Sequence, residues 1–120
     1  MADFDVEERT IAEVHARYVD GSLTARRVTQ AYLDRIAACD KRGPYLNALI
    51  TLNPRALEEA DRLDAALRDS GELRGALHGI PVVVKDNLDT ADLPTSSGVK
   101  LFQDFIPPRD AFVVAKLRAA

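Results

Sequence analysis

Apolar residues recur every three or four positions in several stretches of the chain, as on the buried face of an α-helix. In the first stretch, Ile11, Val14 and Tyr18 form such a stripe, and Thr10 with Glu13 has the spacing of a capping box. Glycine follows each of the first three stretches and marks their ends. The pattern predicts helices over about residues 10–20, 24–40, 54–70 and 110–119.

Two apolar segments lack helical spacing and predict β-strands over about residues 46–52 and 80–85. The run Val82–Val84 has no alternating polar residues, which is typical of a strand covered on both faces. This pattern indicates the α/β class, with a mixed β-sheet flanked by helices. A covered strand needs neighbours on both sides, and the chain offers too few. We therefore expect residues 1–120 to be part of a larger protein, with the sheet incomplete.

The composition is that of an ordinary globular protein, with 47% apolar and 29% charged residues and a formal net charge of -3. This charge argues against a strongly basic nucleic-acid-binding surface. A single cysteine, Cys39, rules out an intrachain disulfide and fits a reducing, cytoplasmic setting. The longest apolar run, Ile80–Val84, is too short to span a membrane. We expect a cytoplasmic protein that binds neither nucleic acid nor membrane.

The sharpest motif runs from Gly79 to Asn87, where Lys85 ends the valine-rich run and precedes a polar loop. Functional side chains concentrate where rigid elements run out into loops. Burial there would disfavour the ammonium form and lower the pKa of the lysine, which could then accept a proton as a general base. The residues alone favour a plainer interpretation, a solvated lysine or one paired with Asp86.

Residues 77–90, followed by 93–98, resemble the amidase signature family, which includes bacterial amidases, fatty acid amide hydrolase and the A subunit of glutamyl-tRNA amidotransferase. The specific part is the Gly-Ile-Pro-x-x-x-Lys-Asp-Asn core at 79–87. The resemblance extends over most of the chain and includes residues 21–24, 46–54 and 110–118. It implies that residues 1–120 are the N-terminal segment of an amidase signature domain.

By this resemblance, Lys85 is the lysine of a Ser–cis-Ser–Lys triad. In the family, its neutral amine takes a proton through a bridging serine, which activates a nucleophilic serine for attack on an amide carbonyl. Water then hydrolyses the acyl-enzyme. Neither serine has a counterpart in this sequence, and we interpret Ser96 and Ser97 as turn residues. The chain alone is therefore expected to be inactive, because a lone base has nothing to activate.

The resemblance implies a small-molecule amide substrate for the complete enzyme, and neither a cofactor nor a metal. His15 and His78 have no cysteine or glutamate at ligand spacing, so we do not expect a metal site. Residues 87–90 lack the cysteine associated with the A subunit of the amidotransferase, which favours a general amidase. A different hypothesis is a non-catalytic interaction module that docks on a complementary C-terminal portion or on a second copy of itself.

Overall fold

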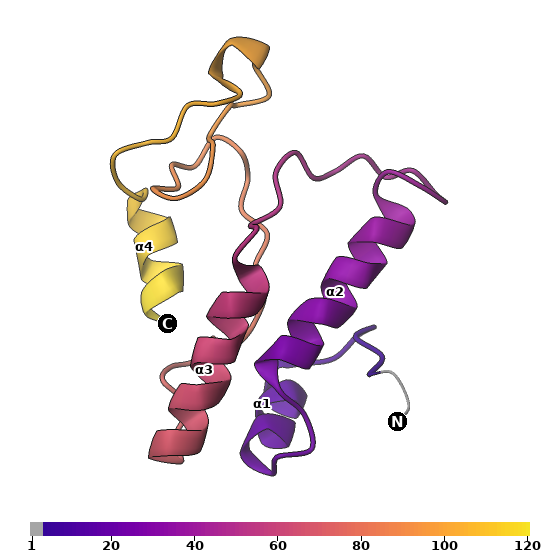
Figure 1. The fold of residues 1–120 in the computed structure, drawn as a ribbon, viewed down its shortest axis with the longest axis vertical. Helices are drawn as coiled ribbons and strands as arrows, with labels where there is room; N and C mark the ends of the chain where they lie inside the picture. Colours follow the sequence, from indigo (N-terminus) through magenta and orange to yellow (C-terminus); the bar gives the residue numbers. More distant parts are fainter. Residues whose placement is uncertain (1–3) are drawn as a thin grey trace. The chain divides into compact units, whose positions relative to one another are not determined.

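The computed structural model describes residues 4–120 and contains four α-helices and one short 3₁₀-helix (Figure 1). They are α1 (Ile11–Val19), α2 (Ala25–Cys39), α3 (Ala56–Ser70), η1 (Lys100–Phe102) and α4 (Phe112–Ala119). The chain divides into two compact units. The first unit contains the residues up to Asn47 and Pro54–Pro81, and the second contains Ala48–Asn53 and Val82–Ala120.

The first two helices begin where the sequence predicts. At α1 the predicted capping box is present, since the Thr10 N–H donates to the Glu13 carboxylate at 2.8 Å and the Glu13 N–H donates to the Thr10 hydroxyl at 3.2 Å. At α2 the Thr24 hydroxyl accepts from the Arg27 N–H at 3.2 Å. These caps satisfy N–H groups that have no partner within the helix.

The third helix begins later than its sequence suggests. It was expected from about residue 54, but Pro54 and Arg55 form a turn and the helix starts at Ala56. Its end matches the prediction, with Gly71 in the left-handed conformation at φ 74°. The Asp64 carboxylate, half-way along α3, accepts from the backbone N–H of Ala25 at 2.7 Å and of Arg26 at 3.0 Å. One helix therefore caps the start of another, where a negative charge is favourable.

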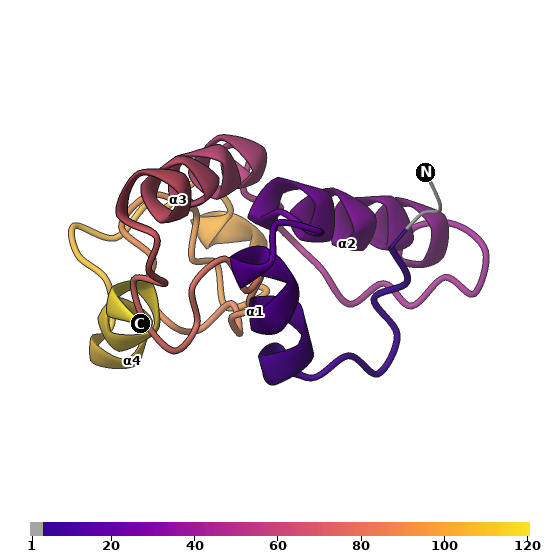
Figure 2. The same cartoon turned by 90° about the horizontal axis from the view of Figure 1, so that it is seen from below.

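The core of the first unit lies among α1, α2 and α3. Helix α3 runs beside α2 in the opposite direction, and α1 lies next to the start of α2 (Figures 1 and 2). The buried cluster consists of Val14, Tyr18, Leu23, Ala25, Val28 and Ala60, with Phe4, Leu67, Leu73 and Ile80 packed against it. Small residues at 25 and 60 allow the helices to approach closely.

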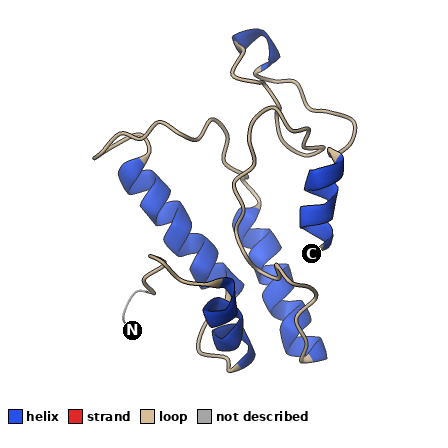
Figure 3. Ribbon diagram, turned by 180° about the vertical axis from the view of Figure 1, so that it is seen from behind, coloured by secondary structure: helices blue, strands red, loops and turns tan. Residues whose placement is uncertain are grey.

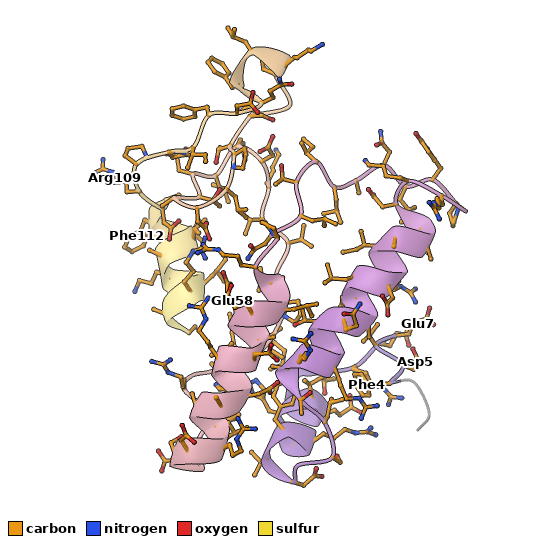
Figure 4. The ribbon with its side chains drawn as sticks, viewed as in Figure 1. Phe4, Asp5, Glu7, Glu58, Arg109 and Phe112 are labelled. Atoms are coloured by element: carbon orange, nitrogen blue, oxygen red, sulfur yellow. The ribbon has the colours of Figure 1, made fainter. Side chains whose placement is uncertain are left out.

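The N-terminal segment is held against this unit by two contacts. The guanidinium of Arg17 lies over the ring of Phe4, 5.4 Å from its centroid, and Glu7 pairs with Arg35 of α2 at 2.6 Å. Figure 4 shows Phe4 and Glu7 next to the helices that carry these partners. Both contacts are near the surface, so we expect them to orient the segment more than to stabilise the unit.

No strand is present in the described part of the chain, so the expected mixed sheet is not formed here (Figure 3). The start of the segment 46–52 does not have strand geometry. Asn47 has a φ of 48°, in the left-handed region, and its N–H donates back to the Asp40 carbonyl at 2.8 Å. The segment 80–85 is coil without a paired neighbour. Apolar, β-branched sequence favours a strand, but only inter-strand hydrogen bonds make one.

The second unit is rich in loops and contains η1 and α4. Its last helix was expected near Asp110 and begins at Phe112. The Asp110 carboxylate is used elsewhere, since it accepts from the Ala91 N–H at 2.8 Å and pairs with Arg118 of α4 at 2.9 Å. Among the helices in residues 4–120, none has the length and hydropathy needed to cross a membrane.

Candidate functional site

Lys85 lies in the second unit, at the end of the coil that follows the valines. Its side chain is exposed, and its amine makes no hydrogen bond or ion pair with any residue from 4 to 120. The backbone carbonyl of Lys85 accepts from the Leu88 N–H at 3.0 Å, which begins a turn. The withdrawal from water that a neutral lysine requires is therefore not provided within these residues.

The neighbouring Asp86 is firmly engaged by the loop at 96–98. Its carboxylate accepts from the backbone N–H of Ser96 at 2.9 Å and of Gly98 at 3.1 Å, and from the Ser96 hydroxyl. The Asp86 carbonyl also accepts from the Ser97 N–H at 2.8 Å. Asp86 thus closes a loop to Ser96, ten positions further along the chain, immediately after the lysine.

These hydrogen bonds also set the charge of Asp86. Donation by the Ser96 hydroxyl, and then by the N–H groups of Ser96 and Gly98, lowers the pKa of the Asp86 carboxyl below its usual value of 3.8. The carboxylate is therefore ionised near neutral pH, but it points its oxygens at this loop. Of the two plainer interpretations of Lys85, pairing with Asp86 is not what the structure shows, because no ion pair joins the two side chains, whereas an exposed, solvated lysine is what residues 4–120 show.

Ser96 and Ser97 are turn residues, as the sequence predicts. The Val99 N–H donates to the Ser96 carbonyl at 2.9 Å across a turn whose central residues, Ser97 and Gly98, have φ values of 52° and 71°. Two successive positive φ angles are typical of a type I′ turn. Ser96 is buried with its hydroxyl committed to Asp86, so in this chain it holds the loop closed.

A second set of contacts ties this loop to the rest of its unit. Thr90 and Thr95 are both buried, and the hydroxyl of Thr95 accepts from the Thr90 N–H at 3.2 Å. The Ala111 N–H donates to the Asp89 carbonyl at 2.9 Å, and Arg118 of α4 also pairs with Asp92 at 2.5 Å. The backbone after Lys85 is therefore held by α4 as well as by Asp86.

The segment that leads toward Lys85 is anchored in the first unit at His78 and Gly79. The Tyr18 hydroxyl donates to the Gly79 carbonyl at 2.9 Å, and Nε2 of His15 lies 2.9 Å from the His78 carbonyl oxygen. Because a carbonyl can only accept, this nitrogen of His15 must carry a hydrogen. Sequence reasoning missed this anchor, although His15 and Tyr18 stand three residues apart on one face of α1.

Burial shifts the pKa of two side chains at this anchor, Tyr18 and His78. Burial raises the pKa of the Tyr18 hydroxyl. Burial, followed by the nearby His15, lowers the pKa of His78 from its usual 6.5. Nδ1 of His78 accepts from the Arg74 N–H at 3.0 Å, so the neutral ring carries its hydrogen on Nε2, which is buried without a partner in the described residues. No group of side chains in that range is arranged to hold a metal ion.

Comparison with known proteins gives the family. A model of the Amidase family matches residues 27–120, which include Lys85, Asp86 and the turn at 96–99. The chain belongs to the amidase family. The predicted resemblance is therefore confirmed at the level of the family.

Individual relatives fall into two groups. The A subunit of glutamyl-tRNA(Gln) amidotransferase from Alkaliphilus metalliredigens is 46% identical over 96% of this chain and 23% of its own length. The peptide amidase of Stenotrophomonas maltophilia is 48% identical with a TM-score of 0.87, over 94% of this chain and 23% of the solved one. An amidase family protein of Bacillus anthracis is 40% identical with a TM-score of 0.86, over 94% and 22%. The chain thus spans about a quarter of the length of these relatives.

Proposed function

We propose that this chain supplies the proton-accepting lysine of an amide hydrolase, and that Lys85 is this residue. The observation that carries the proposal is the unpaired amine of Lys85, which is free although the carboxylate of Asp86 stands next to it in the sequence. A lysine without a counter-ion loses its charge more readily once it is withdrawn from water. Membership of the amidase family supports the same role.

In the proposed reaction, the neutral amine of Lys85 takes a proton from a bridging serine. That serine takes the proton of a nucleophilic serine, whose oxygen attacks the amide carbonyl, and the amine of the substrate leaves with a proton. Water then cleaves the acyl-enzyme to give the carboxylic acid. Both serines would come from polypeptide outside residues 1–120, so we propose that the chain by itself is inactive.

A chimera tests this role. In it, the chain replaces the matching segment of the Stenotrophomonas maltophilia peptide amidase, and hydrolysis of a peptide amide is measured. We expect the chimera to be active and the Lys85→Ala variant to lose about 100-fold or more of kcat, the usual contribution of a general base. Lys85→Arg should be equally inactive, because a guanidinium stays charged.

The matched control is Lys100→Ala, which removes an exposed lysine of η1 in the same unit. It should leave turnover near that of the unmodified chimera. A Lys85→Ala chimera with more than about a tenth of the original rate would contradict the assignment, because a lost general base costs at least that much. A folded chimera that is inactive with Lys85 intact would contradict it as well.

The second candidate within the family is the A subunit of the amidotransferase. The 46% identity to the Alkaliphilus metalliredigens protein is close to the 48% identity to the peptide amidase, so overall similarity does not separate the two. The general amidase stays preferred because residues 87–90 lack a cysteine. The substrate separates them: grafted into both relatives, the chain should support peptide amide hydrolysis better than amidotransferase activity.

A further inference from the structure

Two side chains of α1 hold the backbone at the start of the segment that leads to Lys85. The Tyr18 hydroxyl donates to the Gly79 carbonyl at 2.9 Å, and Nε2 of His15 donates to the His78 carbonyl at 2.9 Å. Tyr18 is 4% exposed, His78 is 3% exposed, and Gly79 is buried as well. A hydrogen bond in such surroundings is stronger than one in water. We call His15 and Tyr18, together with the two carbonyls that they hold, the α1 clamp.

Gly79 is the residue that lets one helix reach both carbonyls. Successive carbonyls of an extended chain point to opposite sides, whereas Gly79 has a φ of 67°, in the left-handed region, where the chain turns. His15 and Tyr18 stand three residues apart and so share a face of α1. An added Cβ at position 79 would lie 2.8 Å from the Ala25 Cβ and 2.9 Å from a ring carbon of Tyr18. The backbone is therefore packed closely against the clamp as well as hydrogen-bonded to it.

The polar groups of the clamp are more than packing requires. A phenylalanine would fill the space of the Tyr18 ring without burying a hydroxyl, and a buried hydroxyl is costly unless it makes a hydrogen bond. The His78 ring is not part of the clamp, because its Nδ1 accepts from the Arg74 N–H at 3.0 Å. Both donors of α1 thus contact backbone carbonyls and not side chains. They set the position of the chain itself.

Lys85 lies between two held points of the chain. Six residues before it, the clamp holds Gly79, and directly after it the Asp86 carboxylate is bound by backbone N–H groups of the loop at 96–98. Between these points, Pro81 has a φ fixed by its ring, and the three valines that follow favour an extended backbone. Because this segment has restricted freedom, a displacement at Gly79 is passed along the chain toward the lysine.

We propose that Tyr18 and His15 are positioning residues for Lys85. By holding the carbonyls of Gly79 and His78, they fix where the segment begins and thereby where the lysine amine meets the bridging serine. A general base must lie within about 2.6–3.2 Å of the group whose proton it takes, and a displacement of about 1 Å caused by a distant substitution can cost about 100-fold in rate. The inference rests on the proposed role of Lys85 as proton acceptor, and it adds the residues that place it.

Tyr18→Phe tests the first contact in the chimera with the Stenotrophomonas maltophilia peptide amidase. It removes one hydroxyl and keeps the ring against Gly79. We expect kcat for peptide amide hydrolysis to fall about tenfold or more while KM stays within about twofold, because the position of the base affects the reaction step and not substrate binding. A kcat within about twofold of that of the unmodified chimera would overturn the role of Tyr18.

The matched control for stability is Thr10→Ala, on the same helix. Thr10 caps α1 through hydrogen bonds with Glu13, so its loss weakens the helix without removing a contact to the backbone at 78–79. Both Thr10→Ala and Tyr18→Phe should lower the urea midpoint of unfolding, but Thr10→Ala should leave kcat unchanged. An equal fall of kcat in the two variants would show that activity follows helix stability, and this would overturn the inference.

A pair of variants at His15 tests the second contact. His15→Gln places an amide N–H near the position of Nε2, whereas His15→Leu has a similar size and no donor. His15→Gln should keep at least about half of kcat, and His15→Leu should lose about as much as Tyr18→Phe. Equal rates for the two His15 variants would overturn the role of this residue. If Tyr18→Phe is unfolded at the assay temperature, the His15 pair decides the inference.

Combination with Lys85→Ala separates this inference from the proposed function. If Tyr18 acts through Lys85, adding Tyr18→Phe should lower the residual kcat of the Lys85→Ala chimera by less than about twofold, since an absent base cannot be misplaced. A further loss of about tenfold would place the effect elsewhere and overturn the inference. Full activity of Lys85→Ala would instead contradict the proposed function. An inactive Lys85→Ala chimera, with normal kcat in Tyr18→Phe and His15→Leu, would overturn the inference alone.

Discussion

His15 donates from Nε2 to the backbone carbonyl of His78, 2.9 Å away, and so joins α1 to the segment that leads toward Lys85. The His78 ring is 3% exposed and accepts the Arg74 N–H on Nδ1. Protonation of Nδ1 would place a hydrogen against this N–H and a charge in a buried position. The neighbouring groups that act on His78 are His15 and Arg74, which oppose its charge, and Asp64 and the Leu63 backbone, which favour it.

The first prediction is a loss of stability in mild acid. The pKa of His78 is lowered in the folded state from 6.5, so the unfolded chain binds more protons as the pH falls below that value. The neutral, buried His78 makes its full contribution to the unfolding free energy above about pH 6.5, its pKa in the unfolded chain. Below that pH this contribution declines. We expect the urea concentration at the midpoint of unfolding to decrease when the pH is lowered from 7.5 to 5.5. In His78→Asn, which keeps an acceptor for Arg74 but does not titrate, the decline should be smaller.

The second prediction concerns the close approach at Gly79. Its φ is 67°, and an added Cβ would lie 2.8 Å from the Ala25 Cβ and 2.9 Å from a ring carbon of Tyr18. Gly79→Ala should cost about 2–4 kcal/mol of unfolding free energy, from overpacking together with backbone strain. Gly21→Ala is the control, since its φ is 77° but nothing lies within 4 Å, and it should cost only about 1 kcal/mol. Equal losses in urea unfolding would contradict the packing argument.

The third prediction concerns the start of α1. Thr10→Ala removes the hydroxyl that accepts from the Glu13 N–H and should lower the unfolding free energy by about 1 kcal/mol. Thr10→Ser keeps the oxygen and should be nearly neutral. Thermal unfolding followed by circular dichroism compares the two, and a Thr10→Ser variant as unstable as Thr10→Ala would show that the methyl group, and not the cap, matters.

The fourth prediction concerns the loop closed by Asp86. Asp86→Ala removes the acceptor for the N–H groups of Ser96 and Gly98, so their amide exchange should accelerate by about tenfold or more, as expected for lost hydrogen bonds to a charged group. Asp89→Ala serves as the control, because Asp89 contacts Ala111 through its backbone carbonyl, which the substitution keeps. In the unmodified chain, the same protection from exchange should be lost as the pH falls below the usual Asp pKa of about 3.8. Because the pKa of Asp86 is lowered in the folded state, its carboxylate stabilises the loop above that pH and loses this effect once it is protonated.

Local signals in the sequence predicted the local structure of this chain. The capping box at Thr10, the cap at Thr24 and the left-handed Gly71 are all visible as short-range patterns, and the structure contains each of them. The start of α3 differs from its prediction because Pro54 and Arg55 form a turn before the helix. The strands are absent for a different reason: β-branched residues at 82–84 favour a strand, but no residue of the described chain pairs with their backbone.

The candidate site was predicted only where a motif marked it. Lys85 and the turn residues Ser96 and Ser97 could be named from sequence, whereas the contact between Asp86 and Ser96 could not. Those two residues are ten positions apart in a loop without a periodic pattern, so the sequence does not predict the hydrogen bond between them. Cys39, of a residue type that is usually buried, is only half-buried at the last position of α2. The role of Lys85 stays a prediction until the chimera is assayed.

The unequal distribution of buried apolar residues has a consequence for any thermodynamic measurement on this chain. Since the hydrophobic cluster belongs to the three-helix unit and the loop-rich unit contributes little beyond Val114 and Pro107, the heat absorbed on melting should come mainly from the three-helix unit. Substitutions around Lys85 should then leave a calorimetric trace unchanged. Their effect should instead be measured as faster amide exchange of Ser96 and Gly98.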